Sequence, residues 1–234
     1  MQTLAAAFKY LTVWGFIGSQ PTPEMVGKSV VYFPLVGLSL GLLLGLSNYM
    51  LAPYLDPEIL NLVVIAILIS ATGAQHLDGV KKAFDALGAK TAGDDWRTNE
   101  ALGIATIVLV VLGKNAAANS MDEILTLSLL LMPVLARWAL IIFLYGYDPR
   151  FDEIPRRIAK QVNFWRLLAT TAAILALTMY LLGRKGLWIA FFVSIFTLFL
   201  RGMLYRRHGV LSHVDVRASV ELTETLSLIL LASL

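Results

Sequence analysis

The sequence predicts an all-α, polytopic integral membrane protein. We expect a single transmembrane domain over residues 1–234, with about seven transmembrane helices and an N-terminal interfacial or re-entrant helix. Hydrophobic residues make up 58% of the chain and charged residues 15%, and the mean hydropathy is +0.73. These values lie far from those of soluble globular proteins.

The N-terminal segment, residues 1–29, is too short and too interrupted to span a membrane. Two glycines and two prolines between residues 15 and 23 break its apolar pattern, and a span needs about 20 apolar residues. We therefore expect the interfacial or re-entrant helix here. The apolar stretch 4–17 carries a lysine in its middle and lacks a small-residue cleavage site, so we expect no cleavable signal peptide.

Seven candidate spans follow, at residues 30–51, 59–72, 102–121, 124–145, 164–182, 187–205 and 218–234. The first carries Gly37, Gly41 and Gly45 at every fourth position. A stripe of small residues lets a neighbouring helix approach closely. We expect this stripe to serve packing between helices.

The lysines and arginines predict the orientation, because cytoplasmic loops carry an excess of both. With the N-terminus inside, fourteen of the 19 lie in inner segments, two in outer loops and three within spans. The outer residues are Arg184 and Lys185, and those within spans are Lys114, Arg137 and Arg166. The sequence therefore predicts a protein of the cytoplasmic (inner) membrane, with its N-terminus and its active site on the cytoplasmic side.

Other features of the composition exclude several classes of function. The chain has no cysteine, which rules out disulfides, thiolate metal sites and cysteine nucleophiles. Its net charge of +3 is too small to indicate a nucleic-acid partner. A transporter is disfavoured, because the sequence shows no inverted repeat of broken spans.

Residues 71–88 form the most informative stretch, because an apolar segment stops there and a polar, acid-bearing helix begins. In such a helix Asp78 and Asp85 share one face, with Lys82 between them. These carboxylates, with His76 just before them, form a candidate magnesium site, since magnesium usually takes one or two carboxylates plus substrate phosphates. The alternative is that both acids form salt bridges with the two adjacent lysines.

Four further candidate site residues are charged and lie inside the predicted spans or at their ends. Glu221 and Glu224 share a face at the start of the last span and, if buried, must meet cations or a metal. The alternative is that they only favour a helix N-terminus. Arg137 lies roughly 13 Å deep at 1.5 Å per residue, so it should face a cavity, a carboxylate or a phosphate. Lys114 either takes a similar role or extends to the interface.

The order of the motifs resembles the cobalamin synthase family, the adenosylcobinamide-GDP ribazoletransferases, over nearly the whole chain. Residues 72–79 (Thr-Gly-Ala-Gln-His-Leu-Asp-Gly) closely follow Thr-Gly-Gly-Leu-His-Leu-Asp-Gly, the most specific family motif. Residues 8–12 (Phe-Lys-Tyr-Leu-Thr) and 32–37 (Tyr-Phe-Pro-Leu-Val-Gly) resemble two N-terminal segments of the family. Residues 206–209 (Arg-Arg-His-Gly) and 221–224 (Glu-Leu-Thr-Glu) resemble two of its C-terminal elements.

The chain departs from the family pattern in its acidic motifs. After Leu-Asp-Gly the family reads Leu-Ala-Asp-Thr-x-Asp, and Lys82 occupies the position of the middle aspartate. The family's Gly-Asp-Val-Leu-Gly-Ala corresponds to residues 213–218 (His-Val-Asp-Val-Arg-Ala), with Val214 in place of the acid. Its Lys-Asp-Ser-Arg-x-Gly-x-x-Gly corresponds to residues 94–103, which include Arg97.

The resemblance implies a membrane transferase of the last steps of cobalamin biosynthesis, which joins adenosylcobinamide-GDP to α-ribazole or its 5′-phosphate and releases GMP. It implies a magnesium ion that neutralises the pyrophosphate, an acid that takes the proton of the attacking ribose hydroxyl, and basic side chains that hold phosphates. We expect the site at the cytoplasmic ends of the second, third and last spans. The expected catalytic residues are Asp78, Asp85 and His76; the expected substrate-binding residues are Arg137, Arg97, Lys82 and Lys114; and the expected metal ligands are Asp78, Asp85, Glu221 and Glu224.

A second function is compatible with the same resemblance. Lys82 places an ammonium where the pattern has a carboxylate, and a positive charge weakens the binding of a divalent cation. The chain would then be a non-catalytic corrinoid-binding homologue, or an assembly partner with a degenerate metal site. The expected partners are the nucleotide-activated corrinoid, α-ribazole and the lipid membrane, and further a second copy of the chain or other membrane proteins of the cobalamin pathway.

Overall fold

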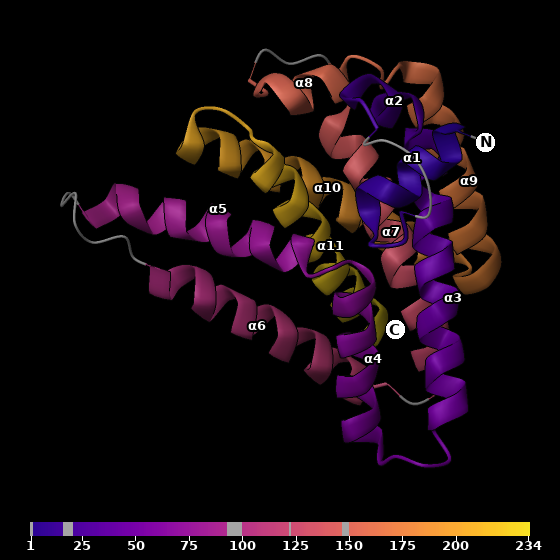
Figure 1. The fold of residues 1–234 in the computed structure, drawn as a ribbon. Helices are drawn as coiled ribbons and strands as arrows, with labels where there is room; N and C mark the ends of the chain where they lie inside the picture. Colours follow the sequence, from indigo (N-terminus) through magenta and orange to yellow (C-terminus); the bar gives the residue numbers. More distant parts are fainter. Residues whose placement is uncertain (1, 16–20, 93–99, 122, 147–149) are drawn as a thin grey trace.

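A computed structural model describes residues 2–15, 21–92, 100–121, 123–146 and 150–234. Within these residues the chain is all-α, as the sequence predicts (Figure 1). Its helices are α1 (Gln2–Leu11), α2 (Pro23–Lys28), the 3-10 helix η1 (Val30–Tyr32), α3 (Phe33–Leu51), α4 (Pro57–Ala71), α5 (Gln75–Ala92), α6 (Glu100–Asn119), α7 (Leu125–Leu144), α8 (Glu153–Ala159), α9 (Phe164–Leu182), α10 (Arg184–His208) and α11 (His213–Ala232).

Each of the seven predicted spans contains a helix, but the count of seven spans is not confirmed. In the described part of the chain, five helices are long and apolar enough to cross a membrane, and the bent pair of α4 and α5 makes a sixth if it is one span. With 15 residues, α4 covers only about 22 Å at 1.5 Å per residue, less than the roughly 30 Å of a bilayer core. Helix α11, which contains most of the predicted last span 218–234, carries Arg217, Glu221 and Glu224. The chain is therefore a multi-pass, all-α membrane protein with fewer clear spans than expected.

The N-terminal segment forms two short helices, where the sequence predicts one interfacial or re-entrant helix. Helix α1 has ten residues and α2 has six, so neither spans a bilayer. The Thr22 hydroxyl accepts a hydrogen bond from the backbone of Met25, and Pro23 occupies the first turn of α2. Helix α2 packs on α8, where Arg157 Nε donates to Glu24 Oε1 at 2.7 Å. These helices lie together at one end of the molecule (Figure 1).

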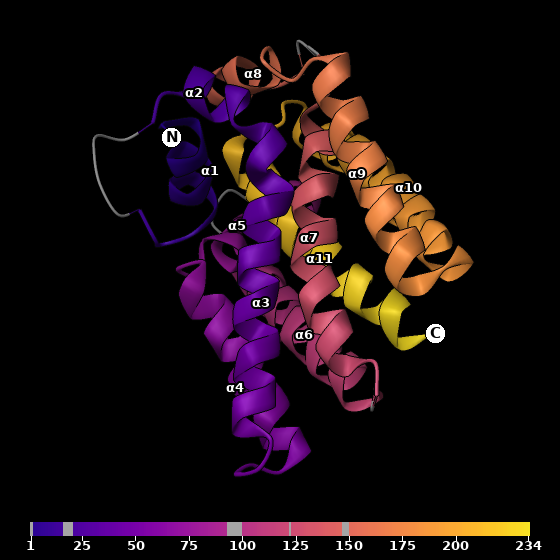
Figure 2. The same ribbon diagram turned by 90° about the vertical axis from the view of Figure 1, so that its right-hand side faces the viewer.

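Helix α7 lies at the centre of the bundle and packs against α3, α9, α10 and α11. Its Arg137 and Trp138 are among the largest fully buried side chains in the described chain. Figure 2 shows α3 and α7 side by side, with α9 and α10 on the far side of α7. Apolar side chains of α10, among them Trp188, Phe191 and Phe199, are instead exposed, as expected for a surface that faces lipid.

The glycine stripe of α3 lies against the backbone of α7, so the predicted packing role is confirmed. A Cβ added at Gly41 would lie 2.3 Å from the carbonyl oxygen of Leu130, and one at Gly37 would lie 2.5 Å from that of Pro133. At Gly45 the nearest atom is 3.5 Å away, an ordinary van der Waals distance. Two of the three glycines are therefore required for the approach of the two helices.

The turn between α4 and α5 converts an apolar segment into a helix that carries acids. Gly73 has a φ of +63° and Ala74 a φ of +54°, and the two helix axes differ by 86°. A Cβ added at Gly73 would lie 2.6 Å from Val13, whose backbone nitrogen donates to the Ala71 carbonyl at 3.0 Å. The turn thus directs α5 across α4 and places it between α6 and α11 (Figure 1).

Substitution of alanine at Gly41 and at Gly45 tests this packing. We expect Gly41→Ala to destabilise the protein by about 1–3 kcal/mol, because the backbone of α7 cannot yield to the added methyl group. Gly45→Ala is the matched control, and we expect no loss or a small gain, since alanine is favoured over glycine within a helix. Thermal unfolding of both purified variants decides the matter, and equal melting temperatures would contradict the described packing.

Candidate functional site

The acids of α5 form ion pairs with lysines of the same helix. Lys82 Nζ lies 2.7 Å from Asp78 Oδ2, and Lys81 Nζ lies 2.7 Å from Asp85 Oδ2. Each pair joins residues four apart, the spacing that brings side chains together on a helix. The structure thus shows the salt-bridge alternative that the sequence left open, and Lys82 bonds Asp78 alone rather than both acids.

The two aspartates differ in their surroundings. Asp85 accepts a second hydrogen bond, from the backbone nitrogen of Gly103 on α6 at 2.9 Å, and a Cβ added at Gly103 would lie 2.4 Å from Asp85 Oδ1. Asp85 therefore joins α5 to α6. The Asp78 side chain is 42% exposed, which leaves its carboxylate accessible to a substrate.

Four of the predicted site residues form a buried ion network between α6, α7 and α11. Lys114 Nζ lies 2.5 Å from Glu221 Oε1 and 2.6 Å from Glu224 Oε2, and Arg137 donates to Glu224 Oε1. All four residues are at most 4% exposed. Arg137 thus meets a carboxylate, one of the partners that its depth predicted, and Lys114 does not extend to the interface.

The buried ion network is neutral as a whole, since it combines two cations with two carboxylates. Burying a charge is expensive unless it is paired, so each member depends on the others. Both carboxylates already accept from cations. Arg137 Nε and Nη2 have no hydrogen-bond partner among the described residues, but Arg137 is fully buried and a substrate cannot reach it in this arrangement. The network therefore holds helices together rather than presenting a free site for a substrate.

His76 lies close to this network but at a different depth from Asp78. It is 2% exposed, and both of its ring nitrogens lack a hydrogen-bond partner among the described residues. It lines a void of about 10 Å³ together with Tyr10 and Arg217, which is room for about one water molecule. Sequence spacing had placed His76 beside the catalytic acids, whereas the fold turns it into the interior.

The four predicted metal ligands do not fit a magnesium ion in this arrangement. They belong to two separate groups, and in the described chain no three histidine or acidic side chains are close enough to hold a metal. Asp78, Asp85, Glu221 and Glu224 each bond an ammonium group, which competes with a cation for the same oxygens. Arg97, predicted to bind substrate, lies outside the described residues.

Sequence reasoning missed the role of Asp215, which organises the start of α11. Asp215 accepts from the backbone nitrogen and the hydroxyl of Ser212, at 2.8 and 3.0 Å, and lies 2.7 Å from His208 Nδ1. A serine followed three residues later by an acid is a capping pattern that the sequence displays. The acid beside Val214 thus fixes the helix that carries Glu221 and Glu224.

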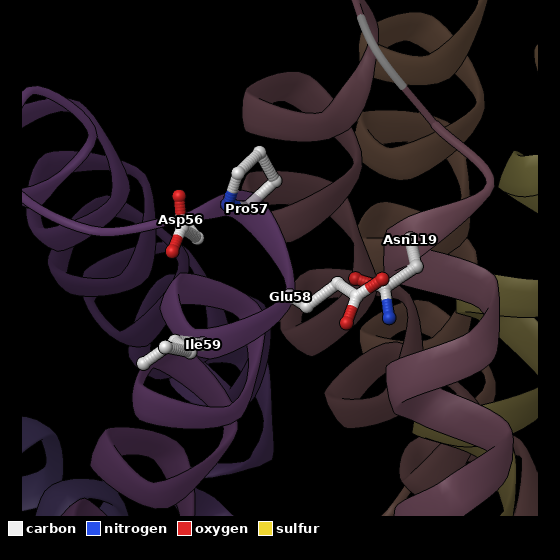
Figure 3. A pocket seen from close by; sticks show the side chains of 5 residues that line it. All are labelled: Asp56, Pro57, Glu58, Ile59 and Asn119. Carbon is white, nitrogen blue, oxygen red and sulfur yellow. The ribbon is translucent and has the colours of Figure 1, made fainter.

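A cavity of about 490 Å³ lies at the other end of the molecule, at the start of α4, and contains none of the predicted site residues. Figure 3 shows the Glu58 side chain pointing toward Asn119, with Asp56 and Ile59 on the other side of Glu58. Two carboxylates on its wall disfavour an anionic substrate. This cavity is therefore a poor candidate for chemistry on phosphates.

Paired substitutions test the buried ion network. We expect Glu224→Gln to cost about 3–5 kcal/mol, because Arg137 loses its carboxylate and stays buried. Glu221→Gln is the control and should lower the free energy of unfolding less, since Lys114 keeps its ion pair with Glu224. The double variant Arg137→Met/Glu224→Gln should lose less than the sum of its single variants. Unfolding of the four purified variants measures this coupling, and strictly additive losses would show that the two residues do not interact.

Comparison with known proteins agrees with the motifs. The family model described as Cobalamin-5-phosphate synthase matches residues 3–232. The chain is 29% identical over 240 residues to the adenosylcobinamide-GDP ribazoletransferase of Geotalea daltonii, covering 96% of this chain and 97% of the relative. It is 31% identical over 244 residues to the enzyme of that name from Stutzerimonas stutzeri, covering 99% and 98%.

A relative of the same name from Pseudomonas fluorescens strain Pf0-1 is 31% identical over 227 residues, with coverage of 91% of this chain and 90% of the relative. No solved structure matches the chain significantly. The alignment with these relatives covers nearly the whole chain. It therefore includes the motif of residues 72–79, with its turn at Gly73, and the acids of α5 and α11. The chain belongs to the cobalamin-5-phosphate synthase family.

Proposed function

We propose that the chain is an adenosylcobinamide-GDP ribazoletransferase of cobalamin biosynthesis. It joins adenosylcobinamide-GDP to α-ribazole or its 5′-phosphate and releases GMP. The observation that carries this proposal is the family match over residues 3–232. Relatives with the name of this enzyme, which align with the chain along nearly their whole length, support it. A non-catalytic corrinoid-binding homologue is not favoured, because the relatives that define the resemblance carry the name of a transferase.

The reaction exchanges one phosphorus–oxygen bond for another. The hydroxyl oxygen of the ribazole attacks the phosphorus next to the cobinamide, the bond from that phosphorus to the oxygen of GMP breaks, and GMP leaves with the electron pair. The proton of the attacking hydroxyl must pass to a base. Asp78 is our candidate for this base, because its carboxylate is partly exposed on α5.

The other predicted residues take distinct roles in this proposal. Lys82 lies 2.7 Å from Asp78 and is itself exposed, so it can approach a substrate phosphate beside the base. Asp85 positions α6, and the buried ion network positions α11. Magnesium, which the resemblance implies, stays a prediction, and no step is assigned to it because the acids do not fit it in this arrangement.

The site and its surroundings are proposed to face the cytoplasm at the inner membrane. The support is the excess of lysine and arginine in the segments on one side of the predicted spans. Helices α1, α2 and α8 and the start of α11 lie at the same end of the bundle (Figure 1). Association with a second copy or with other membrane proteins of the pathway stays a prediction.

Replacement of Asp78 tests the proposed base. We expect Asp78→Asn to lower the rate of GMP release about 10²–10⁴-fold, the usual contribution of a general base, while the protein still inserts and unfolds at the wild-type temperature. Asp56→Asn, at the other end of the molecule, is the matched control and should keep the wild-type rate. An Asp78→Asn variant with an unchanged rate would remove the base from α5.

A further inference from the structure

A second, smaller cavity lies between α1, α2, α5, α8 and α11. Its volume is about 170 Å³, and its polar wall includes Lys9, Gln75 and Arg217. The rest of the described wall is built from Tyr10 and from apolar side chains such as Pro23 and Ile158, with no acid among them. The cavity is therefore cationic, in contrast to the acidic cavity at the other end of the molecule.

Arg217 is the central charge of this cavity. It is half-buried, and the structure gives it no hydrogen bond or ion pair with any described residue. Its backbone is fixed by close packing, because a Cβ added at Gly79 would lie 2.6 Å from Arg217 Cβ. Lys114 and Arg137 have carboxylate partners in the interior, whereas Arg217 leaves a guanidinium directed at a cavity, where it favours an anion.

A second, much smaller void shares part of this wall. Arg217 and Tyr10 also line the void beside His76, whose two buried ring nitrogens lack partners among the described residues. Buried polar atoms normally find a partner. The cavity and the void that His76 lines thus share Tyr10 and Arg217 on their walls.

The sequence shows that this arrangement is a feature of the present chain. In the family pattern Gly-Asp-Val-Leu-Gly-Ala, the position of Arg217 is a glycine and that of Val214 an acid. Beside the same helix crossing, Lys82 also stands in the position of an aspartate. By this match the two motifs lose an acid at Lys82 and another at Val214, and they gain one acid at Asp215. They also gain cations at Lys81, Lys82 and Arg217, which makes this end of α5 and α11 more attractive to phosphates.

We propose that this cavity binds a terminal phosphate group, held by the Arg217 guanidinium with Lys9 and Gln75 on its walls. A volume of about 170 Å³ has room for a phosphate group, since one water needs only roughly 10–15 Å³ of the same measure. It is too small for a nucleotide or a corrinoid, since pockets for larger ligands have about 300–1,000 Å³. The phosphate comes either from the 5′-monoester of the ribazole, an assignment that rests on the proposed function, or from free inorganic phosphate.

Calorimetric titration of the full-length protein with inorganic phosphate tests the site, in nanodiscs of a zwitterionic lipid with EDTA present. We expect Arg217→Gln to weaken phosphate binding about tenfold or more, because a bidentate, charge-assisted pair is lost. The affinity of Arg217→Lys for phosphate should lie between those of wild type and Arg217→Gln. Arg184→Gln is the matched control, because it removes one positive charge at a different place, the first turn of α10. This variant should bind phosphate as tightly as wild type. If Arg217→Gln does not fold, Lys9→Gln tests the same cavity and should also weaken binding.

Wild-type protein that does not bind phosphate, or an Arg217→Gln variant that binds it equally well, would overturn the proposal. Kinetics with two acceptors identify the source of the phosphate. If the preference for α-ribazole 5′-phosphate over α-ribazole falls in Arg217→Gln, the cavity holds the acceptor; if it does not change, the cavity holds free phosphate. The protein could bind phosphate through Arg217 and yet release no GMP with either acceptor. That result would refute the proposed function but not the proposed phosphate site.

Discussion

The contact of Glu224 with Lys114 and Arg137 is the interaction on which the rest of the structure depends. It ties α11 to α6 and α7 deep in the bundle, where an unpaired charge would be costly. Helix α11 in turn packs on α5 at Gly79, so the position of the acid-bearing helix follows from the buried ion network. The charges that resemble a catalytic centre in the sequence therefore act first as a framework for the site.

Depth separates the roles of residues that look alike in the sequence. Glu221 and Glu224 are buried and neutralised by cations, whereas Asp78 stays partly exposed beside Lys82. A transferase that acts on phosphates needs both conditions: a rigid framework that fixes geometry and accessible groups that meet the substrate. The exposed face of α5 provides accessible groups, and so does the cationic cavity at Arg217, which α2 and α8 help to line.

The parts of this fold that rest on local patterns could be predicted from the sequence. Residues 164–182 were expected as a span and form α9, and the pairing of Asp78 with Lys82 follows from a spacing of four. Lys114 and Glu221 are 107 residues apart, so only the tertiary fold shows that they meet. At the sharp turn of Gly73 an added Cβ would lie 2.6 Å from Val13, a long-range proximity that only the fold shows. His76 follows this turn and is buried, whereas spacing alone places it with the catalytic acids.

A reaction in which GMP and corrinoid product are measured together tests the proposed transfer most directly. Purified protein is supplied with adenosylcobinamide-GDP, with and without a ribazole acceptor. We expect equal amounts of GMP and joined product with the acceptor and neither without it, because GMP leaves only as the acceptor oxygen bonds to phosphorus. GMP released without acceptor would instead indicate a hydrolase, and substrate binding without GMP release would indicate a non-catalytic binder; either result would refute the transfer.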